Sequence, residues 1–194
     1  MEKLFQKTSG NDVSKEKLMG IFGELMVLKE IIAPSFGIVS AIQAWGGPGM
    51  QSKDFTLNNT WYEVKTIGAN TDGIHISSLT QLSSDIIGHL AVVRVETVSS
   101  ESGGNSLAVI DVINEILLMI SDESVENQFI KKVQSLSMDV FGKEISYRFD
   151  VKSIKLHKVD KDFPRITEKN VPFSEITDVN YVISAASINR FEEE

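Results

Sequence analysis

Apolar residues recur at helical spacing near the start of the chain and alternate with polar residues further along it. The helical stripe consists of Leu18, Phe22, Leu25, Leu28 and Ile32. Ser14 is suited to cap the start of this helix, and Pro34 is expected to end it because the residue before a proline avoids helical angles. The following residues predict a first strand over Ile38–Trp45 and then a turn at Gly46–Gly49.

The rest of the pattern alternates strands with helices around a loop rich in serine and glycine at Ser99–Asn105. Before this loop we expect a strand at Ile74–Ser77, a short helix at Ser78–Ile87 and a β-branched strand at Leu90–Val98. After it we expect a strand at Leu107–Ile110, helices at Val112–Ser121 and Ser124–Leu136, a long strand over 144–158 and a last strand at Val179–Ala185. These later strands are predicted to join the same sheet.

The segment Ser52–Thr66 predicts a hairpin that carries charged residues. Asn58-Asn59 suits its tight turn because asparagine tolerates left-handed backbone angles. Side chains alternate along a strand, so Glu63 and Lys65 share one face, and the hairpin register brings Asp54 close to Glu63. Two carboxylates beside a lysine form a plausible site for a divalent cation and a phosphate.

A second acidic residue stands two positions before a lysine in Asp150-Val151-Lys152. Its neighbours Tyr147 and Phe149 alternate inward, so Asp150 and Lys152 are predicted to lie on a solvated strand face. The spacing of the acid and the lysine is therefore a weak signal without the surrounding hairpin.

Composition limits the classes of protein that the chain can represent. It has 194 residues and a formal net charge of −8. It has no cysteine, which excludes disulfides and thiolate metal sites. We find no apolar run long enough to span a bilayer and no signal peptide, so we expect a cytoplasmic protein that does not bind membranes. The acidic balance counts against strong non-specific binding to nucleic acid.

Several segments together resemble a bacterial family of PD-(D/E)XK motif proteins, within the restriction-endonuclease-like nuclease superfamily. The resemblance is strongest over roughly residues 18–98. It depends on the segments GIFGELMVLKEIIAP, AWGGPG, KDF, YEVKT and ISSLTQL. Lys53 stands where the motif has proline, and a long N-terminal region of the family members is missing, which favours a short member or a fragment.

The resemblance implies an α/β fold of the restriction-endonuclease-like type. Its αβββαβ core would be a mixed sheet flanked by helices, with further strands and helices added at the C-terminal end. We expect one domain over residues 1–194, with the core at about 14–98 and the C-terminal elaboration at about 99–194.

The resemblance also implies the roles of the site residues. The implied metal ligands are Asp54, Glu63, the Val64 carbonyl and, as an auxiliary ligand, Glu24. Lys65 would activate the attacking water and stabilise charge on the phosphate, and Gln81 would contact the substrate or the water. Mg²⁺ is the implied cofactor, with Mn²⁺ as a substitute.

The residues alone leave other interpretations open. Glu24 lies among apolar positions of its helix and is equally well explained as an acid that forms a salt bridge in the core. Gln81 suits a helix surface or a cap, and Trp61 suits the core better than a stack on a base. Arg148, Lys152, Lys155 and Lys158 fit a solvated strand face better than a nucleic-acid contact.

The resulting hypothesis is a Mg²⁺-dependent nuclease that acts on nucleic acid, DNA before RNA, in a restriction or phage-defence setting. The first alternative is a catalytically silent module that binds a protein or a nucleic acid, which the net charge of −8 favours. The second is a hydrolase of small phosphoesters, which needs a closed pocket. A homodimer, or a further N-terminal or partner subunit, is compatible with the sequence.

Overall fold

The computed structural model of the chain describes residues 14–47, 52–98, 105–136 and 147–193. Its helical elements are α1 (Lys15–Val27), the π-helical turn η1 (Leu28–Ile32), α2 (Ala33–Phe36), α3 (Ile38–Ala44), α4 (Val109–Met119), α5 (Glu123–Gln134) and the 3₁₀ helix η2 (Ala186–Phe191). Its strands are β1 (Phe55–Leu57), β2 (Thr60–Gly68), β3 (Gly73–Ile76), β4 (Gly88–Val98), β5 (Arg148–Val159) and β6 (Tyr181–Ser184). No helix in these ranges has both the length and the apolar character needed to cross a membrane.

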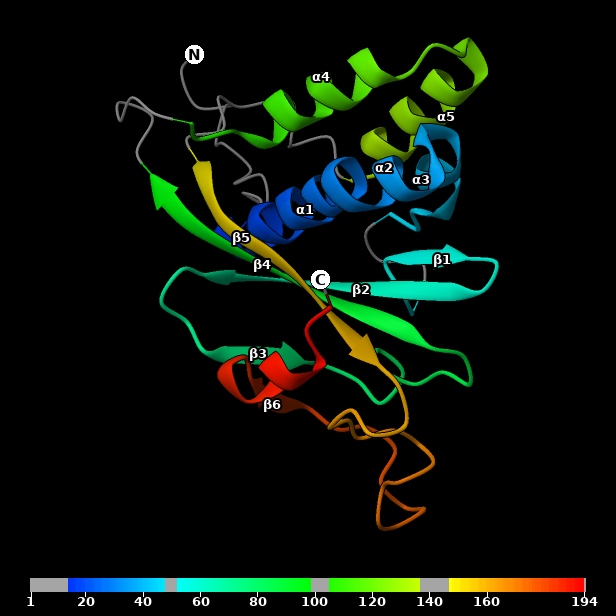
Figure 1. Cartoon of the computed structure of the whole chain (residues 1–194), viewed down its shortest axis with the longest axis vertical. Helices are drawn as coiled ribbons and strands as arrows, with labels where there is room; N and C mark the ends of the chain where they lie inside the picture. Colours follow the sequence, from blue (N-terminus) through cyan, green and yellow to red (C-terminus); the bar gives the residue numbers. More distant parts are fainter. Residues whose placement is uncertain (1–13, 48–51, 99–104, 137–146, 194) are drawn as a thin grey trace, which may run out of the picture.

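Four strands form a mixed sheet in the order β1-β2-β4-β5. β2 and β4 run parallel, whereas the β1–β2 and β4–β5 pairs are antiparallel. β3 pairs with β6 in a separate two-stranded sheet, so the predicted strands at Ile74–Ser77 and Val179–Ala185 do not join the main sheet. Figure 1 shows α1 to α5 together on one side of the four-stranded sheet. The expected α/β class, with a mixed sheet and flanking helices, is confirmed.

The main sheet has a hydrophobic core on each face. Tyr62 and Val64 of β2 belong to the core beneath the helices. Trp61 and Ile67 belong to the core shared with the β3–β6 sheet, which lies opposite the helices in Figure 1. The predicted alternation along this strand is therefore correct, and it places neighbouring side chains in different layers.

The first helix begins as predicted and ends later than predicted. The Ser14 hydroxyl accepts a hydrogen bond from the Lys17 N–H at 3.2 Å, as an N-cap does. Pro34 does not end the helix, because it lies in the first turn of α2, where a missing N–H is tolerated. The helical path ends at Gly37, whose φ of 84° favours glycine.

The predicted strand at Ile38–Trp45 is wrong, because Ile38–Ala44 forms α3. Ala41 and Ile42 follow Ile38 at positions three and four, and both are buried as helical spacing requires. The second half of the turn predicted at Gly46–Gly49 lies outside the described residues.

The helix predicted at Ser78–Ile87 is also absent, since these described residues form turns and bends. The strand predicted at Leu107–Ile110 is reduced to one bridge between Leu107 and Phe149, and α4 already begins at Val109. The strand Leu90–Val98 is confirmed as β4, and the helix Ser124–Leu136 corresponds to α5. Most of the loop at Ser99–Asn105 and residues 144–146 of the long strand lie outside the described residues.

We expect Gly23→Ala to lower the free energy of unfolding by about 1–3 kcal/mol, the usual cost of overpacking. A Cβ at Gly23 would lie 1.8 Å from Oγ1 of Thr66 on β2, so α1 would have to move away from the sheet. Urea denaturation measures the effect. Gly20→Ala is the matched control, because a Cβ there meets nothing within 4 Å, and it should stabilise the helix by about 0.5–1 kcal/mol. Equal effects of the two variants would contradict this packing.

Candidate active site

The short strand β1 places Asp54 against the open edge of β2. The hairpin has the predicted turn at Asn58-Asn59, and β1 pairs with β2 only from Thr60 to Tyr62. Just beyond this pairing, Oδ2 of Asp54 accepts a hydrogen bond from the Val64 N–H at 2.6 Å. The N–H and C=O groups of one strand residue point to the same edge. The Val64 carbonyl therefore points to the edge that Asp54 occupies.

Glu63 and Lys65 form an ion pair on one face of β2. The distance from Lys65 Nζ to Glu63 Oε1 is 3.0 Å, and the Glu63 residue is only 3% exposed. Asp150 and Lys152 on β5 also pair, at 2.7 Å, but their side chains are 36% and 41% exposed. The two acid-lysine pairs therefore differ as predicted, because one is buried in the cluster and the other is an ordinary surface pair.

Gln81 joins this cluster although it does not lie on a helix. Its side-chain oxygen Oε1 accepts hydrogen bonds from Lys65 Nζ at 3.1 Å and from the Ser77 N–H at 2.9 Å. The amide is thereby fixed between the end of β3 and the lysine of β2. The helix predicted around Gln81 is wrong, but its side chain lies beside Lys65.

Glu24 approaches the cluster from the middle of α1. Its Oε2 accepts a hydrogen bond from the indole Nε1 of Trp45 at 2.8 Å, so the carboxyl has a partner inside the protein. Trp45 is itself held at the end of α3, where Lys132 of α5 donates to its carbonyl and, at 2.7 Å, to that of Ile42. The helical layer thus fixes the orientation of Glu24.

Burial and mutual repulsion make the three carboxyl groups hard to ionise. Burial, with repulsion from Asp54, raises the pKa of both Glu24 and Glu63 to about 8. Burial also raises the pKa of Asp54, while the hydrogen bond from Val64 opposes this shift. Glu24 is close enough to Asp54, Glu63 and Lys65 for their charges to affect its pKa. The three acids therefore belong to one electrostatic cluster that a cation would stabilise.

The donor set fits a magnesium ion. Within the described ranges, no three His, Asp or Glu side chains are already grouped closely enough to hold a metal. Mg²⁺ does not require such a cage, because it is usually bound by one or two carboxylates, together with water and substrate phosphate. Asp54, Glu63 and the Val64 carbonyl provide oxygen ligands of this kind.

Two cations near the site had no predicted role. Lys53, noted only for replacing a proline, is buried, and its Nζ lies 4.1 Å from the centre of the Trp61 ring. Burial and the positive charge of Arg165 lower the pKa of Lys53 to about 8, against the opposing effect of Glu63. Arg165 lies in the C-terminal half of the chain, outside every segment on which the family resemblance depends. Their proximity arises from tertiary contacts that short motifs do not encode.

The mixed sheet, the flanking helices and an Asp/Glu-X-Lys strand define an α/β domain of the PD-(D/E)XK nuclease-like class. The model of the family described as "Putative PD-(D/E)XK family member, (DUF4420)" matches residues 1–186. The chain belongs to this family. No curated protein and no solved structure matches it. Proteins of the PD-(D/E)XK superfamily are usually nucleases that use divalent metals.

Proposed function

We propose that this protein is a Mg²⁺-dependent nuclease that hydrolyses phosphodiester bonds, with DNA as its substrate. The observation that carries the proposal is the arrangement around β2, where Asp54 binds the Val64 N–H and Lys65 lies between Glu63 and Gln81. A buried acid-lysine pair at an open strand edge combines metal ligands with a cation for the phosphate. The choice of DNA follows the habit of the superfamily.

Asp54, Glu63 and the Val64 carbonyl would hold the metal, with Glu24 as an auxiliary ligand. When bound, Mg²⁺ polarises the phosphate and lowers the pKa of a coordinated water. The raised pKa values of Glu24 and Glu63 mean that loading the metal at neutral pH releases protons from the site. Binding is therefore expected to be weaker at lower pH.

In the proposed reaction, a water oxygen bonds to phosphorus while the bond from phosphorus to one ester oxygen breaks. The water loses a proton, and the leaving oxygen gains one. Lys65 Nζ stabilises the negative charge that develops on the phosphate oxygens, as a compact ammonium group can. Gln81 keeps this ammonium group in place through its side-chain oxygen.

Asp54→Asn is expected to abolish metal-dependent cleavage and to weaken Mn²⁺ binding by at least about tenfold, because it removes a charged ligand. Plasmid and short linear DNA, incubated with Mg²⁺ or Mn²⁺, provide the cleavage assay, and calorimetry measures metal binding. Asp150→Asn on β5 is the matched control and should behave as the wild type, since Asp150 pairs only with surface residues. Equal cleavage by the wild type and Asp54→Asn would refute the proposal.

A catalytically silent binding module is the second candidate, favoured by the net charge of −8. The same assays separate the two. A silent module shows no difference in cleavage between the wild type and Asp54→Asn and binds no metal at Asp54. Metal binding without cleavage of either DNA would instead direct the search to RNA.

A further inference from the structure

Two basic side chains hold the turn that carries Gln81. The carbonyls of Thr80 and Gln81 each accept a hydrogen bond of 2.5 Å from Lys53 Nζ. The next carbonyl, that of Leu82, accepts one of 2.6 Å from Nη1 of Arg165. In a helix these three carbonyls would accept from N–H groups further along the chain. Here two cations take the place of those donors, which explains how a non-helical turn is stabilised at this position.

The side chain of Gln81 uses the fixed backbone to reach the catalytic cluster. Its Oε1 lies 3.1 Å from Lys65 Nζ and 2.9 Å from the Ser77 nitrogen. The Gln81 carbonyl and those of both neighbouring residues are hydrogen-bonded, so the Gln81 side chain has little freedom to move away from Lys65. The position of the turn therefore determines whether Gln81 meets Lys65.

The ammonium group of Lys53 is held between an aromatic ring and two backbone carbonyls. Lys53 is only 9% exposed, and its ammonium group lies over the Trp61 ring while it donates to the two carbonyls. A buried charge is tolerated only with such partners. Because Lys53 directly precedes Asp54 in the chain, the same backbone segment positions a metal ligand and the turn of Gln81.

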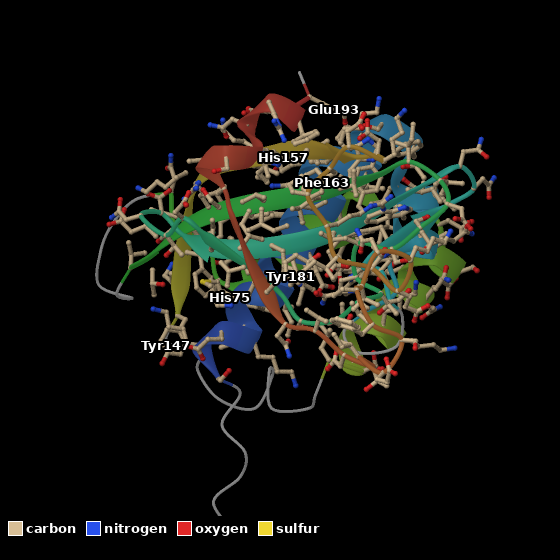
Figure 2. The ribbon with its side chains drawn as sticks, turned by 90° about the horizontal axis from the view of Figure 1, so that it is seen from below. His75, Tyr147, His157, Phe163, Tyr181 and Glu193 are labelled. Carbon is tan, nitrogen blue, oxygen red and sulfur yellow. The ribbon has the colours of Figure 1, made fainter. Side chains whose placement is uncertain are left out.

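Arg165 is anchored by the C-terminal half of the chain. Phe163, two residues before it, is buried in the second core, and the Ile166 N–H donates to the Tyr181 hydroxyl at 3.1 Å. Figure 2 labels Phe163 and Tyr181, which belong to this part of the molecule. The Arg165 carbonyl also accepts a hydrogen bond from the Asn170 amide at 2.8 Å. The backbone that carries the Arg165 guanidinium is therefore held in place.

We propose that Lys53 and Arg165 are positioning residues that clamp Thr80–Leu82 and so align Gln81 with Lys65. This inference rests on the proposed function for its catalytic consequence, but the clamp itself is a structural property. It gives residues 163–166, far from the core motif in sequence, a role in completing the site.

The first test follows hydrogen exchange at the Ser77 amide, which reports the bond to Gln81 without any need for activity. We expect Lys53→Met and Arg165→Met to accelerate this exchange by about tenfold, toward the rate in Gln81→Ala, as loss of a charge-assisted hydrogen bond predicts. Lys53→Arg, which keeps the charge and donors, should recover part of the protection. Arg94→Met is the matched control, because Arg94 binds the carbonyls of Ala69 and Thr71 in another turn.

The second test is a double-mutant cycle on cleavage. If Lys53 acts through Gln81, the double variant Lys53→Met/Gln81→Ala cuts no more slowly than Gln81→Ala alone. If the double variant instead cut more slowly by the product of the two single effects, the proposal would be overturned. Unchanged Ser77 exchange in both Lys53→Met and Arg165→Met would also overturn it. A wild type that does not cut DNA, together with faster Ser77 exchange in the variants, would remove the nuclease function and leave the clamp standing.

Discussion

Lys65→Met should reduce metal-dependent cleavage by about a thousandfold, the scale of losing one donor that stabilises a developing charge. The ammonium group of Lys65 lies 3.0 Å from Glu63 and 3.1 Å from Gln81, so it is held at the edge of the proposed metal site. Methionine keeps most of the side-chain volume and removes the charge. The loss should appear in kcat, because the charge on the phosphate develops in the transition state.

The chain contains its own control for this experiment. Lys152 follows Asp150 at the same spacing as Lys65 follows Glu63, but it pairs with Asp150 and Glu96 on the surface of the sheet. Lys152→Met should therefore leave cleavage unchanged. If both variants lost activity equally, or if neither did, the assignment of Lys65 would be wrong.

A measurement of metal binding distinguishes Lys65→Met from a variant that removes a proposed metal ligand. Lys65→Met keeps Asp54, Glu63 and the Val64 carbonyl, and it removes a positive charge from beside them. Calorimetry should therefore show Mn²⁺ binding at least as tight as in the wild type. A variant that neither binds metal nor cuts would indicate that Lys65 supports the fold of the site.

Local sequence patterns predicted the strand that carries the site. Asn58-Asn59 forms the turn of the hairpin, and alternation assigned Glu63 and Lys65 to one face of β2. The neighbouring residues also distinguished the acid-lysine pair of the hairpin from the solvated pair on β5. These features depend on residues close together in the chain, for which periodicity and turn chemistry are strong signals.

Features that depend on distant residues were not predicted. Ser78–Ile87 was assigned to a helix, but the carbonyls of its turn bind Lys53 and Arg165, which lie far from it in sequence. The strand predicted at Ile38–Trp45 is a helix over Ile38–Ala44, because tertiary packing favours a helix there. Such long-range contacts override local preference.

The partner of Glu24 was missed for the same reason. An acid among apolar helix positions required a partner, and the sequence left ion pairing, hydrogen bonding and metal binding open without naming the residue. The actual hydrogen-bond donor is Trp45, which comes from the end of α3. A neutral indole donor fixes the orientation of the carboxyl group without placing a positive charge beside it.

The concentration of buried acid around β2 implies a conflict between stability and function. Glu63→Gln should raise the free energy of unfolding of the metal-free protein at pH 8 by up to about 5 kcal/mol, since a rise from 4.5 to about 8 spans about 3.5 pKa units of about 1.4 kcal/mol each. Burial and repulsion from Asp54 raise the pKa of Glu63 from 4.5 to about 8. The folded state therefore binds more protons than the unfolded state between these values, and stability falls as pH rises through this window. Glutamine stays neutral and avoids this loss.

Urea denaturation in EDTA at pH 5, 6, 7 and 8 measures the effect, which should be small at pH 5 and grow toward pH 8. Glu96→Gln is the control, because the exposed Glu96 pairs only at the surface and its replacement should change stability by less than about 0.5 kcal/mol. Saturating Mn²⁺ should reverse the order, since only the wild type retains the full charge for the metal. A Glu63→Gln variant less stable than the wild type at pH 8 in EDTA would show that the ion pair with Lys65 outweighs the burial of the carboxylate.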